Sequence, residues 1–489
     1  MSKRRWLSTV LIFALLLSCF PLGISSAKAA TPQQLRQIFD TMDKRTNGGN
    51  WYKNNNNESN ILSWNQSYVM ASYVTMYEAT GDTYYLDRFI DHADSVLKTR
   101  DSVRGVKDYR GLSTPSWRTG GPNYDLNGQI LNGQYYIMGV NTGMISYSFA
   151  EFAAIVYNTP ALAKYKNKAE IYLQAAKDAV AVHDYEWVDN GSTGYYVFKK
   201  GAPYWTDGAN LPHNQYLALA RTQLAIYQAT GDKFYYDRVE KMARLFKNNL
   251  TIDQKTGAYI WHYQWGKGLN GWTSSDNLSV NKPSYGGYKR YEDVSHGAID
   301  VDFAYKAYKA GIVFTEEDMI RFGKTVENYL ILPNGKVAQF VNGGVEAKYQ
   351  IMIAHWLRIS DYAPSAYPLA EKLITSLTGA GGSGMLAIAM TNLAANGGGG
   401  VIIKPQDPVE NPPEQPELPV ESGEIIINGG FEKNQTGWSG SLVTIKTESN
   451  GNKYLTNGYN WQAYQDLNLS AGEYKLTAKT KKLTATTQA

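Results

Sequence analysis

Apolar residues recur at every third or fourth position through most of the chain. Between Tyr68 and Leu97 this spacing predicts two helices, separated by Gly81 and Asp82. Glycine readily adopts the positive φ that ends many helices, and an aspartate after it can cap the next helix. The pattern therefore predicts a hairpin of two helices.

The sequence of this turn recurs later in the chain. Residues 227–232 differ from residues 77–82 at a single position. One hairpin cannot bury its apolar face alone, so several must stack, either in an open solenoid or in a closed ring. For residues 31–398 we expect an all-α toroid of about six hairpins. Weaker copies of the turn lie at 157–160, 308–311 and 360–364.

Long inserts separate the hairpins and are rich in glycine, asparagine and aromatic residues. They span 109–136, 187–212 and 260–290. Loops that gather at one end of a helical ring form binding clefts. The flat faces of tyrosine and tryptophan suit sugar rings, although a single aromatic residue more often fills space between helices. The expected substrate contacts are Trp117, Arg118, Asn141, Asp207, Trp261, His262 and Trp265.

The two ends of the chain differ from the helical region. Residues 1–30 combine a basic start, an apolar run and a small-residue site, which together predict a secretory signal peptide. The alternative is lipid attachment at Cys19, which would leave a surface lipoprotein. Cys19 is the only cysteine, so the exported chain has no disulfide. No second apolar stretch reaches the roughly 18 residues of a membrane span.

A segment rich in proline and glutamate at 399–423 predicts a semi-rigid linker. Residues 424–489 then alternate as strands do. The run from Asn428 to Glu432, followed by Trp438, resembles the start of jelly-roll carbohydrate-binding modules. Such modules usually need about twice this length, so we expect an incomplete β-sandwich.

The densest group of chemically active residues lies between Tyr288 and Asp302. A helix that begins near Glu292 would place Glu292, His296 and Asp300 on one face. An acidic first turn is common, so an ordinary helix start is the plain alternative. Two features favour a functional site: the chain has only six histidines, and this one follows an aromatic insert.

A second group lies at the start of another expected helix, where His213 and Asn214 follow Asp207. These side chains either cap the helix or donate hydrogen bonds to a sugar. The first hairpin has the Asn65-Gln66 pair in the corresponding place, after Trp64 and without a histidine. Because both groups follow long inserts, we expect them to face one cleft.

Composition narrows the function further. The net charge is +4 and 19% of residues are charged, which argues against a nucleic-acid binder. Phosphate-binding loops and the Gly-x-Ser-x-Gly elbow do not occur in the sequence. The segment from Glu292 to His296 could hold a divalent cation, but no third ligand can be identified from sequence. We therefore expect no cofactor and no metal.

The repeated hairpins, the segment from Arg290 to Gly297, the signal peptide and the C-terminal segment together resemble the α/α-toroid carbohydrate-active enzymes. Polysaccharide lyases that cleave alginate or glucuronan are the most similar group. The resemblance implies a secreted monomer that acts on an anionic polysaccharide. It also implies a working set of tyrosine, histidine or asparagine, and arginine. The candidates are Tyr291, His296, His213, Asn214 and Arg290, with Glu292 beside them.

The chemistry explains this choice of residues. In β-elimination a base removes the C5 proton of a uronate, and polar side chains must neutralise the carboxylate. The alternative is a glycoside hydrolase, which uses two carboxyl groups, here Glu292 or Asp293 with Asp207. A third possibility is a glycan-binding surface protein without activity. Near-ultraviolet absorbance by unsaturated products distinguishes the first two.

Overall fold

The computed structural model describes residues 29–398, 444–447 and 453–456. The chain divides into two units, 1–409 and 410–489. In the second unit, β9 (Thr444–Thr447) pairs antiparallel with β10 (Lys453–Thr456). The rest of the expected linker and jelly-roll segment, and nearly all of the signal peptide, lie outside the described residues. Within the described ranges, every helix is too short or too polar to cross a membrane.

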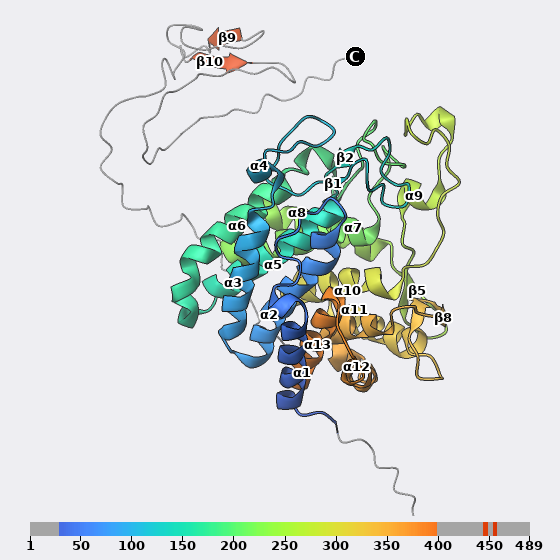
Figure 1. Ribbon diagram of the computed structural model, residues 1–489. Coiled ribbons are helices and arrows are strands. Elements are labelled where there is room, and N and C mark those ends of the chain that lie inside the picture. The colour runs from blue at the N-terminus through green and yellow to red at the C-terminus, as the bar shows by residue number, and fades with distance from the viewer. Residues whose placement is uncertain (1–28, 399–443, 448–452, 457–489) are drawn as a thin grey trace, which may run out of the picture. The chain divides into compact units, whose positions relative to one another are not determined.

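Six helices form a closed inner ring in the first unit (Figure 1). Each contacts the next in chain order, and the last contacts the first, which closes the ring. Apolar residues cover most of their circumference, as expected of helices buried on all sides. In chain order they are α2 (Ser67–Thr80), α5 (Gly139–Tyr157), α7 (His213–Thr230), α10 (Val294–Lys309), η7 (Gln350–Tyr362) and α13 (Gly382–Ala395).

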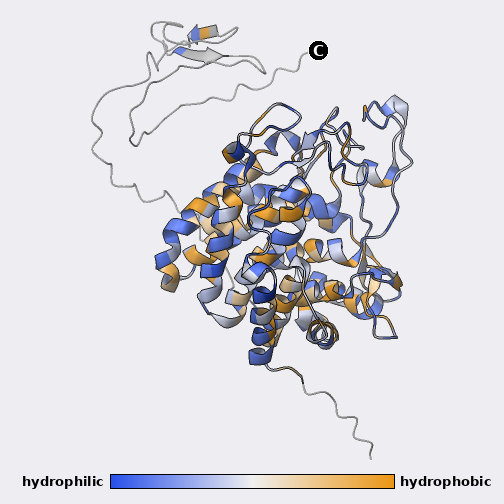
Figure 2. Cartoon of the chain, viewed as in Figure 1, coloured by the Kyte–Doolittle hydropathy of each residue, from blue (hydrophilic) through white to orange (hydrophobic). Residues whose placement is uncertain are grey.

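Six outer helices pack against this ring, one beside each inner helix. Each buries one face, and Figure 2 shows hydrophilic and hydrophobic residues mixed along helices at the periphery. The arrangement is a toroid of six helix hairpins, which confirms the fold expected from the sequence. The outer helices are α3 (Tyr84–Leu97), α6 (Lys166–Ala181), α8 (Lys233–Asn248), α11 (Glu316–Thr325), α12 (Ala366–Thr375) and α1 (Pro32–Arg45).

The repeated turns adopt the expected conformation. Gly81 ends α2 and Gly231 ends α7, each with a φ of 69°. The side chain of Asp232 then accepts a hydrogen bond from the N–H of Phe234 and caps α8. A non-glycine residue in this left-handed conformation would be strained, which explains the glycine.

The two ends of the ring are built differently. Short turns join the first five inner helices to their outer partners, whereas long segments lead from α1, α3, α6, α8 and α11 to the next inner helix. The sixth pair differs, because α1 and α13 come from opposite ends of the toroid sequence and a short segment joins α12 to α13. All inner helices therefore begin at the end of the ring that carries the long segments. Short elements lie in these segments: α4 (Asp101–Arg104), β1 (Thr119–Gly120), β2 (Tyr135–Tyr136), η4 (Asp184–Glu186), β3 (Trp187–Asn190), β4 (Thr193–Tyr196), β5 (Thr251–Ile252), β6 (Tyr259–Ile260), α9 (Gly266–Asn270), η5 (Ser274–Asp276), η6 (Val326–Leu330), β7 (Ala338–Phe340) and β8 (Gly343–Glu346). The remaining short helices are η1 (Asn47–Gly49), η2 (Leu62–Gln66) and η3 (Pro160–Tyr165).

Candidate active site

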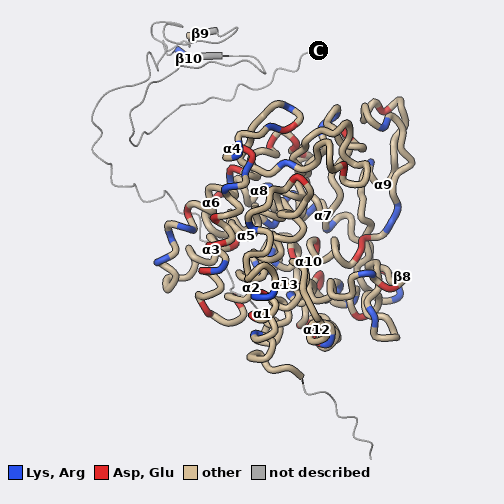
Figure 3. Tube along the Cα trace, viewed as in Figure 1, with Lys and Arg blue, Asp and Glu red and all other residues tan. Residues whose placement is uncertain are grey.

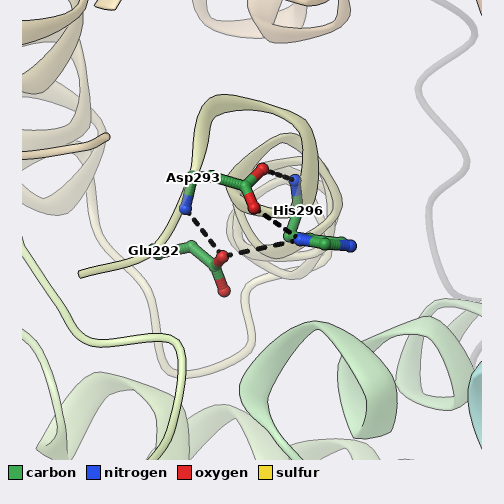
Figure 4. A group of neighbouring side chains, drawn as sticks. All are labelled: Glu292, Asp293 and His296. Atoms are coloured by element: carbon green, nitrogen blue, oxygen red, sulfur yellow. Dashed lines mark hydrogen bonds and ion pairs between the residues drawn. The ribbon is translucent and has the colours of Figure 1, made fainter. Parts of the chain in front are cut away.

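The first turn of α10 brings Glu292, Asp293 and His296 together (Figure 4). Asp293 is the N-cap and accepts hydrogen bonds from the N–H groups of Ser295 and His296, at 2.9 and 3.1 Å. Its second oxygen lies 2.8 Å from Nδ1 of His296. Glu292 Oε1 accepts the N–H of Asp293 at 2.8 Å and lies 3.9 Å from His296 Nδ1. The helix thus begins two residues later than expected, and Glu292 precedes it.

Glu292 also faces Asp300, which lies about two helical turns later in the chain. Both are fully buried, and their carboxyl groups are within hydrogen-bonding reach of each other. Burial raises the pKa of both groups, and the charges of Asp300 and Asp293 raise the pKa of Glu292 further. One oxygen of each has no other partner among the described residues. The raised pKa values of both groups favour a proton on this pair at neutral pH, and such a proton would give one of these oxygens a hydrogen bond.

The pKa of Asp293 is lowered and the pKa of His296 is raised. Burial alone would raise the pKa of Asp293, but the hydrogen bond and charge of His296 bring it below its ordinary value. Burial alone would lower the pKa of His296, but Asp293 raises it above its ordinary value. The two groups therefore stabilise each other as an ion pair. Glu292 and Asp300, whose pKa values are raised, therefore lie next to Asp293, whose pKa is lowered.

His296 is the member of the group that a ligand can reach. Its side chain is 33% exposed, and Figure 4 shows Nε2 pointing away from the two carboxyl groups. Trp64 and Tyr263 flank the imidazole, with ring centroids 6.0 and 5.6 Å away. The arrangement leaves Nε2 to exchange a proton while Asp293 orients the ring.

Buried polar atoms without partners gather at the same end of the ring. They are Asn141 Oδ1 at the start of α5, and Asn214 Oδ1 and Gln215 Oε1 at the start of α7. Leaving such an atom unsatisfied costs about 1–3 kcal/mol, so each points to a ligand or a bound water. The Gln215 amide donates to the Tyr263 hydroxyl at 3.4 Å, which links the start of α7 to the His296 group.

His213 occupies a different environment from His296. It is buried, its Nδ1 lies 2.8 Å from the Tyr216 hydroxyl, and its ring packs against Phe246 and Trp265. Burial lowers the pKa of His213 to about 3. It is therefore a neutral residue of the core, and it supplies no positive charge for a substrate carboxylate.

Asp207 is also fully buried and holds two loops together. It accepts hydrogen bonds from the Ser279 hydroxyl and from the N–H groups of Gly201, Val280 and Asn281. These four bonds use the lone pairs of both oxygens. The geometry does not bring Asp207 into the group at α10.

Arg290 and Tyr291 lie on the segment that leads into α10. Arg290 is exposed, donates to the Tyr288 hydroxyl at 3.1 Å and lies over the Phe340 ring. Tyr291 is half-buried and stacks on His262 with ring centroids 4.4 Å apart. Both are near the group at α10, on its outer side.

The remaining expected contacts mostly hold the loops in place. Trp117 is buried against Phe149, and Arg118 pairs with Glu58 and stacks on Tyr135. Trp261 donates to Asp300 at 2.9 Å, which fixes one oxygen of the buried carboxyl pair. The Trp265 indole donates to the Leu211 carbonyl. The sequence predicted sugar contacts along the run Trp261–Trp265, which contains Tyr263, but it did not predict that Tyr263 and Trp64 flank His296.

The three grouped side chains also offer ligand atoms for a metal, all within 4.8 Å of one another. Metal binding between these groups needs an ionised Glu292 and a deprotonated nitrogen of His296, and Nδ1 is the nitrogen that faces both carboxyl groups. In the structure that nitrogen bonds to Asp293, and burial favours the protonated form of Glu292. The arrangement therefore suits proton transfer better than metal binding.

No protein-family model and no curated protein matches this sequence. Several solved structures resemble its fold. The GH76A α-1,6-mannanase of Salegentibacter sp. HEL1_6 is 12% identical, with 74% of this chain and 98% of that chain covered and a TM-score of 0.46. A family 76 glycoside hydrolase from a bovine Bacteroides thetaiotaomicron strain is 14% identical, with 75% and 77% covered and a TM-score of 0.45. Dfg5 of Chaetomium thermophilum, solved with glucosamine, is 12% identical, with 74% and 90% covered and a TM-score of 0.42.

These likenesses concern the helical fold alone. The first two proteins are named as carbohydrate-active enzymes on such a fold, and they are glycoside hydrolases. The resemblance to alginate and glucuronan lyases drawn from the sequence gains no support from them.

Proposed function

We propose that the protein is a glycoside hydrolase that cleaves a polysaccharide at the start of α10. The observation that carries this proposal is the pair of adjacent carboxyl groups, Glu292 and Asp293, whose pKa values are shifted in opposite directions. Glycoside hydrolysis needs one carboxyl group that retains a proton and one that is ionised. Adjacent sequence positions with opposite protonation states supply both.

In this proposal the proton moves outward through His296. Glu292 is fully buried and does not touch a sugar, but its Oε1 lies 3.9 Å from His296 Nδ1. A protonated His296 donates from Nε2 to the glycosidic oxygen as the bond breaks. A water molecule adds to the anomeric carbon and releases one proton, which replaces the proton that the protein gave up. Asp293 stabilises the imidazolium before transfer, and the proton held by Glu292 and Asp300 is available to restore it.

The polar atoms at the starts of α5 and α7 provide the sugar contacts. Asn141, Asn214 and Gln215 each have a buried oxygen that lacks a partner among the described residues and could accept a sugar hydroxyl. Trp64 offers an aromatic face beside His296. Donor, acceptor and stacking groups at one end of a toroid are the usual composition of a glycan site.

β-Elimination is the second candidate, and one observation favours it. An imidazole oriented by a carboxylate, with a free Nε2 and a tyrosine beside it, is also a suitable base for a C5 proton. In that case His296 removes the proton and Tyr263 protonates the departing oxygen.

A substrate screen separates the two. The protein is incubated with α-1,6-mannan, neutral glucans, alginate, glucuronan and hyaluronan, and both reducing ends and near-ultraviolet absorbance are followed. We expect new reducing ends without absorbance. A parallel rise in absorbance would assign the site to β-elimination instead.

Export is a separate proposal, which rests on the signal peptide expected at residues 1–30. N-terminal sequencing of protein recovered from a secreting host is expected to begin near Ala30. Recovery of a lipid-modified chain that begins at Cys19 would instead indicate a surface lipoprotein.

A further inference from the structure

The loop of residues 271–287 lies between α9 and the start of α10 and doubles back on itself. Figure 1 shows the segment that follows α9 standing out from the helices of the ring. Two backbone hydrogen bonds pair Trp272 with Tyr285, each N–H donating to the carbonyl of the other residue, at 2.8 and 2.9 Å. Gly271 and Gly287 flank this pair, and a Cβ on either would overlap a backbone oxygen of the opposite side. The loop is therefore closed at its base.

Hydrogen bonds also hold the middle of this loop against its neighbours. Asp207 accepts the N–H groups of Val280 and Asn281 at 3.0 and 2.9 Å. The Asn281 amide donates to the carbonyls of Ala202 and Tyr204 at 2.7 and 2.9 Å. A loop fixed in this way presents its side chains in one arrangement, so little conformational entropy remains to be lost when a ligand binds.

Two aromatic rings form an open face on this loop. Trp205 and Tyr285 meet edge to face, with ring centroids 5.6 Å apart, and both are half-buried. The buried Trp272 packs against Tyr285, with ring centroids 4.8 Å apart, and its indole donates to the Lys282 carbonyl at 2.7 Å. Packing thus fixes the rings while part of each remains exposed, which suits the apolar face of a sugar.

Lys282 places a positive charge on the same face. Its amino group lies 5.0 Å from the ring centroid of Trp205 and 5.4 Å from that of Tyr285, within the range of cation–π contacts. In the described part of the chain this amino group makes no ion pair with a carboxylate. Asp207, the carboxylate that holds the loop, already accepts four hydrogen bonds. The charge of Lys282 is therefore free to pair with an anionic group of a ligand.

Basic residues continue from Lys282 to the start of α10. Between Asp276 and Glu292 the chain contains Lys282, Lys289 and Arg290 and no acidic residue. Lys289 and Arg290 are exposed, and neither pairs with a carboxylate among the described residues. Figure 3 shows this basic stretch, followed by the acidic start of α10. An edge with net positive charge attracts an anionic polymer.

Aromatic rings connect this face to His296. Tyr263 lies beside His296, and its ring centroid is 6.2 Å from that of Tyr288. Tyr288 is 38% exposed. Tyr285 lies near Tyr288 in turn, since burial and then the neighbouring Tyr288 raise the pKa of Tyr285. A glycan bound at His296 can therefore continue along these rings toward Lys282.

We propose that Trp205, Lys282 and Tyr285 form a subsite for a uronate unit of an acidic polysaccharide. The sugar lies against the two rings, and its carboxylate pairs with the Lys282 amino group. One cation matches the single charge of a carboxylate better than a phosphate monoester, which carries about −1.5 to −2 at pH 7. This inference rests on the proposed function for the position of the cleaved bond, and it adds the class of substrate.

Binding of the full chain to immobilised polysaccharides tests the subsite without activity. His296→Ala is introduced into every protein so that the polymers are not consumed. The probes are glucuronan, alginate and polygalacturonate, with α-1,6-mannan as the neutral polymer and a phosphorylated mannan as the alternative anion. We expect at least one uronate polymer to bind about tenfold more tightly than α-1,6-mannan, and more tightly than the phosphorylated mannan.

Three variants test the contacts of the subsite. Lys282→Met keeps the length of the side chain and removes the charge, so uronate binding is expected to weaken about tenfold. Lys282→Arg keeps the charge and is expected to bind nearly as tightly as the parent protein. Tyr285→Leu removes one ring and is expected to weaken binding roughly two- to tenfold.

Lys309→Gln is the matched control, because it removes the same charge at the other end of α10. Lys309 is exposed, makes no ion pair among the described residues, and lies about 20 Å from His296 along the helix. This variant is expected to bind uronate polymers as the parent does. The proposal is overturned if either mannan binds as tightly as the best uronate polymer or if no polymer binds. It is also overturned if folded Lys282→Met binds normally, or if Lys309→Gln weakens binding as much.

Kinetics separate failure of the subsite from failure of the proposed function. If a uronate polymer is hydrolysed, Lys282→Met alone is expected to raise KM with kcat little changed. Hydrolysis of neutral mannan only, unaffected by Lys282→Met, would reject the subsite and leave the hydrolase assignment in place. Uronate binding that depends on Lys282, with β-elimination or without cleavage of any polymer tested, would support the subsite and reject the hydrolase assignment.

Discussion

The starts of α7 and α10 look alike in sequence and differ in chemistry. Each follows a long aromatic insert and carries a histidine in its first turn, His213 in α7 and His296 in α10. His213 is enclosed by aromatic rings, and burial lowers its pKa to about 3. His296 is partly exposed, and Asp293 raises its pKa despite burial. One histidine is a neutral core residue, and the other is a group that can exchange protons.

The residue before each helix accounts for the difference. Pro212 precedes α7 and has no side-chain group to cap the helix. Asp293 precedes α10, caps it with one oxygen and pairs with the histidine through the other. A single N-cap carboxylate therefore fixes both the helix start and the charge of the imidazole.

The largest loss of activity is expected when His296 is replaced. His296→Ala removes the only group at the start of α10 that combines exposure with a proton to exchange. We expect kcat to fall by roughly 10²–10⁴-fold, because general acid catalysis is lost. Initial rates on the substrate found by the screen measure this. Activity within a few-fold of wild type would remove His296 from the mechanism.

Asp293→Asn tests whether Asp293 raises the pKa of His296. The amide keeps a capping oxygen but lacks the charge, so the pKa of His296 is expected to fall. Because protonated His296 is the proposed acid, activity is then expected to be lost at a lower pH than in the wild type as the pH is raised. An NMR titration of the imidazole measures this directly. An unchanged pKa for His296 would show that Asp293 does not set it. Asparagine caps helices about as well as aspartate, so the cap is expected to be kept and any loss of stability to come from the lost ion pair with His296.

Replacing His213 is expected to change the pH dependence of stability and not the mechanism. Its folded-state pKa lies below its unfolded value of about 6.5, so the unfolded chain binds the extra proton. The stability it contributes is present above pH 6.5 and is lost as pH falls toward 3. Denaturant unfolding at several pH values should show less acid destabilisation in a folded His213→Phe variant than in the wild type. Equal acid sensitivity would mean that His213 is not held neutral.

The smallest effect is expected at the repeated turns. Gly81 has a φ of 69° and nothing lies within 4 Å of the position that a Cβ would take, so Gly81→Ala costs only the backbone strain. We expect a loss of about 1 kcal/mol, measured by chemical denaturation, with kcat unchanged. A larger loss would mean that the turn contributes more than a helix end.

The sequence predicted the toroid because its evidence is local and repeated. Apolar spacing and the Gly-Asp turns mark each hairpin, and stacking follows from the need to bury their faces. Glu292 and His296 were found for a similar reason, since they are neighbours along one helix start. The linker at 399–423 and the segment at 424–489 stay predictions.

The rest of the site depends on contacts between distant residues. Trp64, Tyr263 and His296 come from three separate segments of the chain and meet only because the ring closes. The opposite protonation states of Glu292 and Asp293 arise from depth of burial, which one residue's position in the sequence does not reveal. His213 was considered a substrate contact because its enclosure by Phe246 and Trp265 has no local signature.

We propose that this toroid cleaves glycosidic bonds with water at the start of α10. Mass spectrometry of products formed in ¹⁸O-labelled water tests it most directly, with Glu292→Gln as the matched variant. Hydrolysis places one heavy oxygen on the anomeric carbon of each new reducing end and leaves the old glycosidic oxygen on the other fragment. We expect this in the wild type and at least about a hundredfold less product in Glu292→Gln. Products without the label, carrying an unsaturated sugar, or equal labelling in the variant would contradict the account.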